Sequence, residues 1–143
     1  MELHHFQVTK TARVYTHGVL DQHTREVWLC CHGYGQLAQY FLKRLAPIYA
    51  PERFLIIPEG LSRFYLGKDY QDVGASWMTK EDRHHEIDDY IRYLTQVWQH
   101  FQIPAGVQIN VLGFSQGTAT AFRWAKSGAV FADHLILWAG AIP

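Results

Sequence analysis

The sequence predicts an α/β fold in which a mostly parallel sheet is covered by helices on both faces. Short apolar runs, too brief for helices, recur along the chain. Between them lie segments whose apolar residues are spaced three and four apart, as on one face of a helix. Strands that alternate with helices pair in parallel through crossover connections. With 143 residues and 48% hydrophobic content, residues 1–143 are expected to form a single domain.

Six strands are predicted in order. Two short alternating stretches at the start, residues 5–10 and 12–17, predict an antiparallel hairpin. The later runs are almost uniformly apolar, as in central strands that are buried on both faces. These four runs are residues 26–32, 53–57, 107–112 and 134–138.

Three helices are predicted between and after these strands, over residues 36–49, 80–101 and 115–127. The second has the clearest one-sided period in the chain. Its start is expected at Thr79, because the acidic residues that follow suit the unpaired N–H groups of a helix N-terminus. Residues 58–80 are predicted to form a long loop, because proline and glycine open the segment.

The strongest chemical signal is Gly113-Phe114-Ser115-Gln116-Gly117. It follows an apolar strand and precedes a helical pattern, which is the strand-turn-helix setting of a G-x-S-x-G nucleophile elbow. A turn this tight leaves no room for side chains at Gly113 and Gly117. Ser115 is therefore predicted to project from the carboxyl edge of the sheet as a nucleophile. The alternative, a helix-capping serine, would explain Ser115 but not the two glycines.

The second signal is His32-Gly33-Tyr34-Gly35, directly after the first buried strand. Backbone N–H groups in a glycine-rich turn can approach the negative charge that develops on a tetrahedral intermediate. The N–H groups of Tyr34 and Gln116 are the predicted oxyanion donors, and Gly33 and Gly35 are the structural glycines of this turn. The alternative is an ordinary strand-to-helix turn in which His32 has a structural role.

The order of these motifs resembles the phospholipase/carboxylesterase family of α/β-hydrolases, which includes acyl-protein thioesterases. The resemblance covers most of the chain, through HGYGQ, then PEG, then SWMTKEDR and then GFSQG. It implies an α/β-hydrolase fold and a serine hydrolase that acts on small carboxylic esters or thioesters through an acyl-enzyme at Ser115. It also makes Trp77 a wall of the acyl pocket.

The resemblance leaves two points open within the motifs. The apolar pair Trp77 and Met78 in the long loop suits substrate binding, and equally suits anchoring of the loop to the core. The family usually has a glycine where this sequence has Thr118. This branched residue is expected to crowd the first turn of the helix.

The sequence after Ser115 departs from the family, in which an aspartate and then a histidine follow the serine. Only Asp133 and His134 are available, and they lie at the start of the last predicted strand, at the opposite sheet edge from Ser115. The fold is therefore expected to be truncated after the sixth strand, with the carboxyl-terminal strands and helices missing. An uncovered last strand predicts self-association. The alternative function is a catalytically incomplete fragment or pseudoenzyme that acts only in binding or assembly.

Composition excludes several classes of function. Thirteen basic and thirteen acidic residues give zero formal charge without long blocks of one sign, so nucleic acid is not expected as a partner. No segment reaches the roughly 18 apolar residues of a membrane span, and the start lacks the pattern of a signal peptide, so a cytoplasmic location is predicted.

Cysteine and histidine usage predicts neither a disulfide nor a cofactor. Cys30 and Cys31 are adjacent within a strand and point to opposite faces, so they are expected to be reduced and buried. The adjacent pairs at 4–5 and 84–85 are poorly arranged for chelation, because neighbouring side chains diverge on strands and helices. No metal site is predicted.

Overall fold

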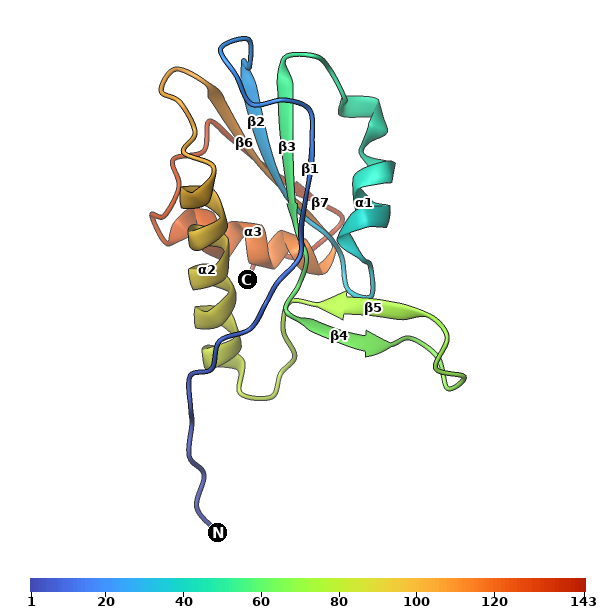
Figure 1. Cartoon of the computed structure of the whole chain (residues 1–143). Helices are drawn as coiled ribbons and strands as arrows, with labels where there is room; N and C mark the ends of the chain where they lie inside the picture. The colour runs from blue at the N-terminus through green and yellow to red at the C-terminus, as the bar shows by residue number, and fades with distance from the viewer.

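The computed structural model describes residues 1–143 and contains a five-stranded sheet in the order β1-β3-β2-β6-β7 (Figure 1). Strands β2, β3, β6 and β7 run parallel, and β1 pairs antiparallel with β3 at one edge. The predicted mostly parallel sheet with an antiparallel start is confirmed. The strands are β1 (Val14–His17), β2 (Glu26–Cys31), β3 (Arg53–Pro58), β6 (Gln108–Phe114) and β7 (His134–Trp138).

Helices cover both faces of this sheet, as predicted. Helix α1 (Ala38–Arg44) lies on one face, and α2 (Arg83–His100) and α3 (Gln116–Lys126) lie on the other (Figure 1). None of these helices combines the length and apolar character that a membrane crossing requires.

The core forms on both sides of the central strand β2, because successive side chains of a strand point to opposite faces. Leu29 and Cys31 pack with Trp124 and other buried side chains of α2 and α3, whereas Cys30 packs with Phe41 of α1. Both cysteines are fully buried and free, as predicted. Burial raises the pKa of both thiols, so they are neutral core side chains.

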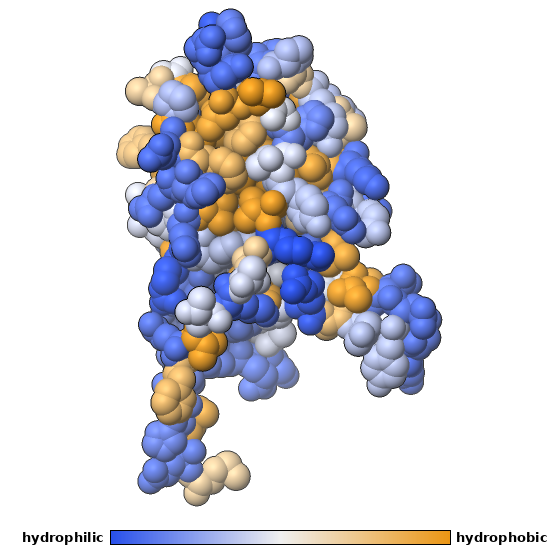
Figure 2. Space-filling view, in the orientation of Figure 1, coloured by the Kyte–Doolittle hydropathy of each residue, from blue (hydrophilic) through white to orange (hydrophobic).

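The predicted hairpin at the start of the chain is wrong in one strand. Residues 5–10 form no strand, and β1 instead pairs with β3 in a register that places Val14 opposite Pro58. An alternating pattern marks an extended segment without specifying its partner, and β1 already occupies this edge of β3. Residues 1–13, hereafter the N-terminal arm, form no helix or strand, and the apolar side chains of Phe6 and Val8 are exposed. The start of the arm extends away from the body of the protein (Figures 1 and 2).

Two helices begin or end differently from the prediction. Helix α1 stops at Arg44 and is followed by a 3₁₀ turn, η1 (Ala46–Ile48), because Pro47 has no N–H to continue an α-helical ladder. Helix α2 begins at Arg83, and its N-cap is Asp82 rather than Thr79. The Thr79 hydroxyl instead accepts a hydrogen bond of 3.2 Å from the Glu81 N–H, which forms a local turn ahead of the helix.

The segment predicted as a long loop contains a second, small sheet. Strands β4 (Ser62–Tyr65) and β5 (Val73–Ser76) form an antiparallel hairpin that projects beyond the main sheet (Figures 1 and 2). An isolated bridge between Gln36 and Ala75 joins the hairpin to the turn after β2. The chain therefore has seven strands rather than six, five of them in the main sheet.

Candidate active site

The two glycine-rich motifs meet where β2 and β6 end. These strands pair in parallel with Cys31 opposite Gly113, so the turn after β2 and the turn after β6 lie side by side. The chain leaves β2 towards α1 on one face and leaves β6 towards α3 on the other. Such a switch point opens a crevice outside the carboxyl ends of parallel strands, and ligands bind there in α/β sheets.

Ser115 has a strained backbone at this point. Its φ is 53° and its ψ is −116°, a conformation that costs a residue with a side chain about 1–3 kcal/mol. The Ser115 N–H donates to the Trp138 carbonyl oxygen at 2.9 Å, and its carbonyl oxygen accepts from the Thr118 N–H at 3.0 Å. The side chain is exposed and makes no capping hydrogen bond to α3, which removes the helix-capping alternative.

The glycines on either side of Ser115 lie too close to other backbone to carry side chains. A Cβ at Gly113 would lie 2.3 Å from the Gly117 oxygen, and a Cβ at Gly117 would lie 2.2 Å from the Cys31 oxygen. Neither separation is compatible with a carbon atom there. Because these two residues are glycines, the first turn of α3 can pack directly against the end of β2.

Thr118 is accommodated without the crowding expected from the sequence. Its side chain is fully buried, and Oγ1 lies 3.2 Å from the carbonyl oxygens of both Gly113 and Trp138. The room comes from Gly140, where a Cβ would lie 2.3 Å from Thr118 Oγ1. The Thr118 hydroxyl thus links the elbow to the end of β7.

His32 has a structural role in the turn after β2. Its Nδ1 lies 2.8 Å from the Gly33 oxygen, and its Nε2 accepts a hydrogen bond of 2.9 Å from the Gly60 N–H. This pairing assigns the proton to Nδ1. Burial lowers the pKa of His32, which favours the neutral ring. With both nitrogens occupied, His32 has no free position from which to serve Ser115 as a base.

The rest of the turn brings Tyr34 to the same edge. The Gly33 N–H donates to Gln36 Oε1 at 2.7 Å, and a Cβ at Gly33 would lie 3.2 Å from Ser115 Cβ. Gly35 adopts a φ of 77°, a conformation that favours glycine, and its N–H donates to the Ala75 oxygen at 2.9 Å. The Tyr34 N–H between them donates no hydrogen bond within the chain.

Gln116 serves the site through its side chain as well as its backbone. Its N–H is the first of α3, where no preceding turn supplies a carbonyl acceptor. Its Oε1 accepts from the Trp77 N–H at 3.1 Å, and its Nε2 donates to Ser76 Oγ at 3.1 Å and to the Met78 oxygen at 2.8 Å. These three bonds hold residues 76–78 beside the elbow. The sequence motif contains no signal for them.

The loop residues Trp77 and Met78 are anchored by contacts with the core and with helices α2 and α3. The Trp77 indole N–H donates to the His32 oxygen at 2.8 Å, and the ring is 2% exposed and packs edge-on against Tyr90. Met78 is half-buried, and its Sδ lies 3.6 Å from a guanidinium nitrogen of Arg123. These contacts favour the anchoring role of Trp77 over a role as a pocket wall.

Glu59, which lies in the PEG motif but was given no role from the sequence, is a buried carboxylate beside this site. Its Oε1 accepts from Arg13 at 2.9 and 2.7 Å and from Arg63 at 3.3 Å, and its Oε2 accepts from the Ala38 N–H at 3.1 Å. The carboxylate thus joins the end of the N-terminal arm, the start of α1 and the β4–β5 hairpin. The signals in the sequence are its place after the proline that ends β3 and its membership of the PEG motif.

Asp133 and His134 lie at the opposite end of the sheet from Ser115. The β6–β7 register pairs His134 with Asn110, four residues before Phe114, which amounts to about 13 Å along the strand. Asp133 Oδ2 accepts from the Ile109 N–H at 2.7 Å, and His134 Nδ1 lies 2.8 Å from Asn110 Oδ1. Neither residue reaches Ser115 in this arrangement.

Comparison with known proteins identifies relatives through structure only. No protein-family model and no curated protein sequence matches the chain. Similar solved structures are acyl-protein thioesterase 2 of Zea mays, with 20% identity and a TM-score of 0.67, and a phospholipase/carboxylesterase of Dyadobacter fermentans, with 20% identity and a TM-score of 0.66. The esterase PE8 is similar at 15% identity and a TM-score of 0.64.

The fold of this chain is therefore the α/β-hydrolase-type fold of these esterases and thioesterases. The matches cover 93%, 95% and 93% of this chain but only 64%, 63% and 66% of the three solved structures, in the same order. The chain thus spans less than two thirds of the length of the proteins that it resembles.

Proposed function

We propose that this chain carries the nucleophile of a serine hydrolase of the phospholipase/carboxylesterase family, which acts on carboxylic esters or thioesters. The observation that carries the proposal is Ser115, strained and exposed between two glycines that have no room for a side chain. A serine needed only for packing or capping requires neither the strain nor the exposure. Backbone strain of this kind is concentrated at functional sites.

The proposed reaction proceeds through an acyl-enzyme. Ser115 Oγ attacks the acyl carbon, and the N–H groups of Tyr34 and Gln116 donate to the oxyanion of the tetrahedral intermediate. The leaving alcohol or thiol departs with a proton, and water then hydrolyses the ester at Ser115. The N–H of Tyr34 has no acceptor within the chain, which leaves it available for this role.

The base for this reaction is proposed to come from outside residues 1–143. A serine hydroxyl is a weak nucleophile at neutral pH without an adjacent base, and in this fold the acid and the histidine follow the serine in the chain. Asp133 and His134 are held at the other end of the sheet by hydrogen bonds to β6. The two free, buried cysteines fit a cytoplasmic site of action, where thiols stay reduced.

A second candidate function is a binding or assembly module without catalysis. The observation in its favour is that Ser115 Oγ receives no hydrogen bond from, and donates none to, an imidazole or carboxylate of this chain. In that case the crevice binds an ester or acyl group without turnover. The exposed edge of β7, with half-exposed Trp138, would serve for self-association.

Hydrolysis of an activated ester separates the two functions. We expect the chain to hydrolyse p-nitrophenyl acetate, and a matching thioester, at a low rate that depends on Ser115. Without an adjacent base the hydroxyl of Ser115 is a weak nucleophile, so this rate should lie far below that of a complete triad. Ser115→Ala should remove this rate, whereas Ser62→Ala, at an exposed serine of β4, should not. A rate equal in all three proteins would contradict the hydrolase and favour the binding module.

A further inference from the structure

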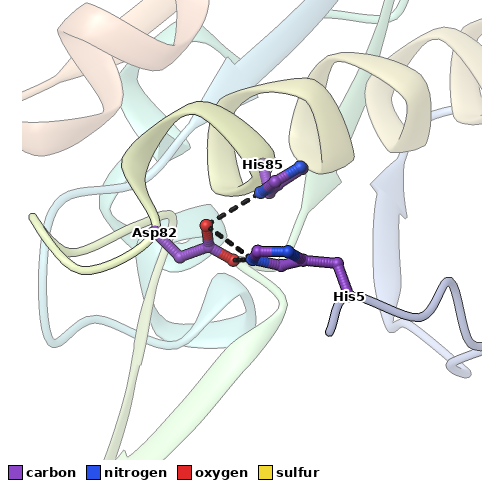
Figure 3. Close-up of side chains that lie close together, drawn as sticks. All are labelled: His5, Asp82 and His85. Atoms are coloured by element: carbon purple, nitrogen blue, oxygen red, sulfur yellow. Dashed lines mark hydrogen bonds and ion pairs between the residues drawn. The ribbon is translucent and has the colours of Figure 1, made fainter. Parts of the chain in front are cut away.

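The N-terminal arm crosses the start of α2 and places a histidine beside the N-cap residue and a residue of the first turn of that helix (Figures 1 and 3). His5 Nε2 lies 3.2 Å from Asp82 Oδ1 and 3.2 Å from Asp82 Oδ2. His85 Nδ1 lies 2.8 Å from Asp82 Oδ1. Figure 3 shows the two imidazole rings on the same side of the carboxylate, and their centroids are 4.3 Å apart.

The spacing of these three groups matches a metal site. One ligand atom from each residue lies within 4.8 Å of the others. In a tetrahedral Zn²⁺ site the ligands stand about 2.0–2.2 Å from the ion, which places them about 3.3 Å from one another. The two separations to Asp82 are already near that value, so an ion needs only a small adjustment of exposed side chains.

The chemistry of the ligands also fits. Two imidazole nitrogens and one carboxylate oxygen are a ligand set that Zn²⁺ accepts, and water can fill a fourth position because all three side chains are about half exposed. Solvent exposure supplies the entry path.

We propose that His5, Asp82 and His85 bind a divalent transition-metal ion of the Zn²⁺ class, which fixes the N-terminal arm against the start of α2. This site lies outside the Ser115 crevice. Sequence reasoning predicted no metal site because it considered only neighbouring histidines, whereas here one ligand lies 77 residues from the next in the chain. The bound ion attaches the arm to the helix more strongly than hydrogen bonds between exposed groups would, because such bonds contribute little stability.

The chain offers matched controls for this proposal. His4 and His84 are exposed neighbours of the two histidine ligands and lie outside the cluster. The experiment is a calorimetric titration of the purified chain with ZnCl₂ at about pH 8, where protons compete less for imidazole. Wild type is compared with His5→Ala, His85→Ala, His4→Ala and His84→Ala. Circular dichroism checks that each variant keeps its fold.

We expect one Zn²⁺ per chain, and binding at least about tenfold weaker in His5→Ala and His85→Ala, because even loss of a second-shell partner weakens metal binding about 10- to 100-fold. His4→Ala and His84→Ala should bind as wild type does. Zn²⁺ should also slow tryptic cleavage after Lys10 in the wild type but not in His5→Ala. The proposal is overturned if the chain does not bind Zn²⁺, or if the control variants lose as much affinity as the ligand variants.

Discussion

Trp77→Phe tests whether this residue anchors the loop that borders the active site. The substitution keeps an aromatic ring but removes the indole N–H, which donates to the His32 oxygen at 2.8 Å in a buried position. It also leaves a gap beside Tyr90, against which the indole packs edge-on. Both effects destabilise the folded state if the side chain is an anchor.

The magnitude follows from these two contacts. A buried carbonyl left without its partner costs about 1–3 kcal/mol. Shortening a bicyclic ring to a phenyl ring removes part of the 3–5 kcal/mol that a buried aromatic residue loses on truncation to alanine, or about 1 kcal/mol here. We therefore expect the free energy of unfolding to fall by about 3 kcal/mol, which corresponds to roughly 10 °C in Tm for a chain of this size.

Urea unfolding followed by far-UV circular dichroism measures this change. The matched control is Trp138→Phe, because Trp138 is 56% exposed and its indole N–H donates to no protein group. The control should stay within about 0.5 kcal/mol of wild type. If Trp77→Phe also stayed within that range, the anchoring role would be refuted and the role as an acyl-pocket wall would regain support.

Three further predictions concern buried groups at the same edge of the sheet. Gly117→Ala should destabilise the fold by about 2 kcal/mol, although alanine normally favours a helix, because its Cβ would lie 2.2 Å from the Cys31 oxygen; equal or higher stability in thermal unfolding would contradict this. Glu59→Gln should lower the free energy of unfolding in urea by about 2 kcal/mol, because hydrogen bonds to two guanidinium groups, each 43% exposed, lose their charged acceptor; an unchanged midpoint would show that the carboxylate is not needed. His32 should make the free energy of unfolding decrease as the pH is lowered below about 6.5. Its folded pKa is lowered by burial, so below the unfolded value of about 6.5 only the unfolded chain takes up the proton.

The His32 contribution is complete above about pH 6.5 and is lost as the pH falls towards the folded pKa, by at most about 1.4 kcal/mol per pH unit. His32→Asn removes the titrating ring, so the variant should lose less stability than wild type between about pH 7 and pH 5. Equal pH dependence in the two proteins would show that His32 does not titrate between these states. The comparison is needed because Asp82 raises the pKa of His85, which acts in the opposite direction.

The strands of the main sheet could be predicted from the sequence because each parallel strand is marked by a local run of apolar residues. In β2, Leu29 and Cys31 face one set of helices and Cys30 faces the other, so a run that is apolar throughout is what a strand buried on both faces requires. The first hairpin could not be predicted correctly, because the partner of β1 is β3, about 40 residues away, and alternation does not identify a partner. The start of α2 shifted because Thr79 bonds to the nearby Glu81 N–H instead of capping the helix.

In the candidate site, too, the features that depend on a local motif could be predicted, whereas the contacts between distant segments could not. The strained turn at Ser115 and the need for Gly113 and Gly117 follow from a five-residue motif in its strand-turn-helix setting. The bonds of the Gln116 side chain to residues 76–78 and the paired charges at Glu59 join segments far apart in the chain. No local pattern specifies such contacts, because they depend on how β3, the hairpin and the elbow meet in space.

The nucleophilic role of Ser115 is tested most directly by covalent labelling. The chain and Ser115→Ala are incubated with a fluorophosphonate, with and without added imidazole as an external base, and intact masses are recorded. We expect a single adduct that forms slowly, forms faster with imidazole and is absent from Ser115→Ala, because the elbow presents the hydroxyl but this chain brings no base to it. An adduct that persists in Ser115→Ala, or no adduct even with imidazole, would contradict the assignment of Ser115 as the nucleophile.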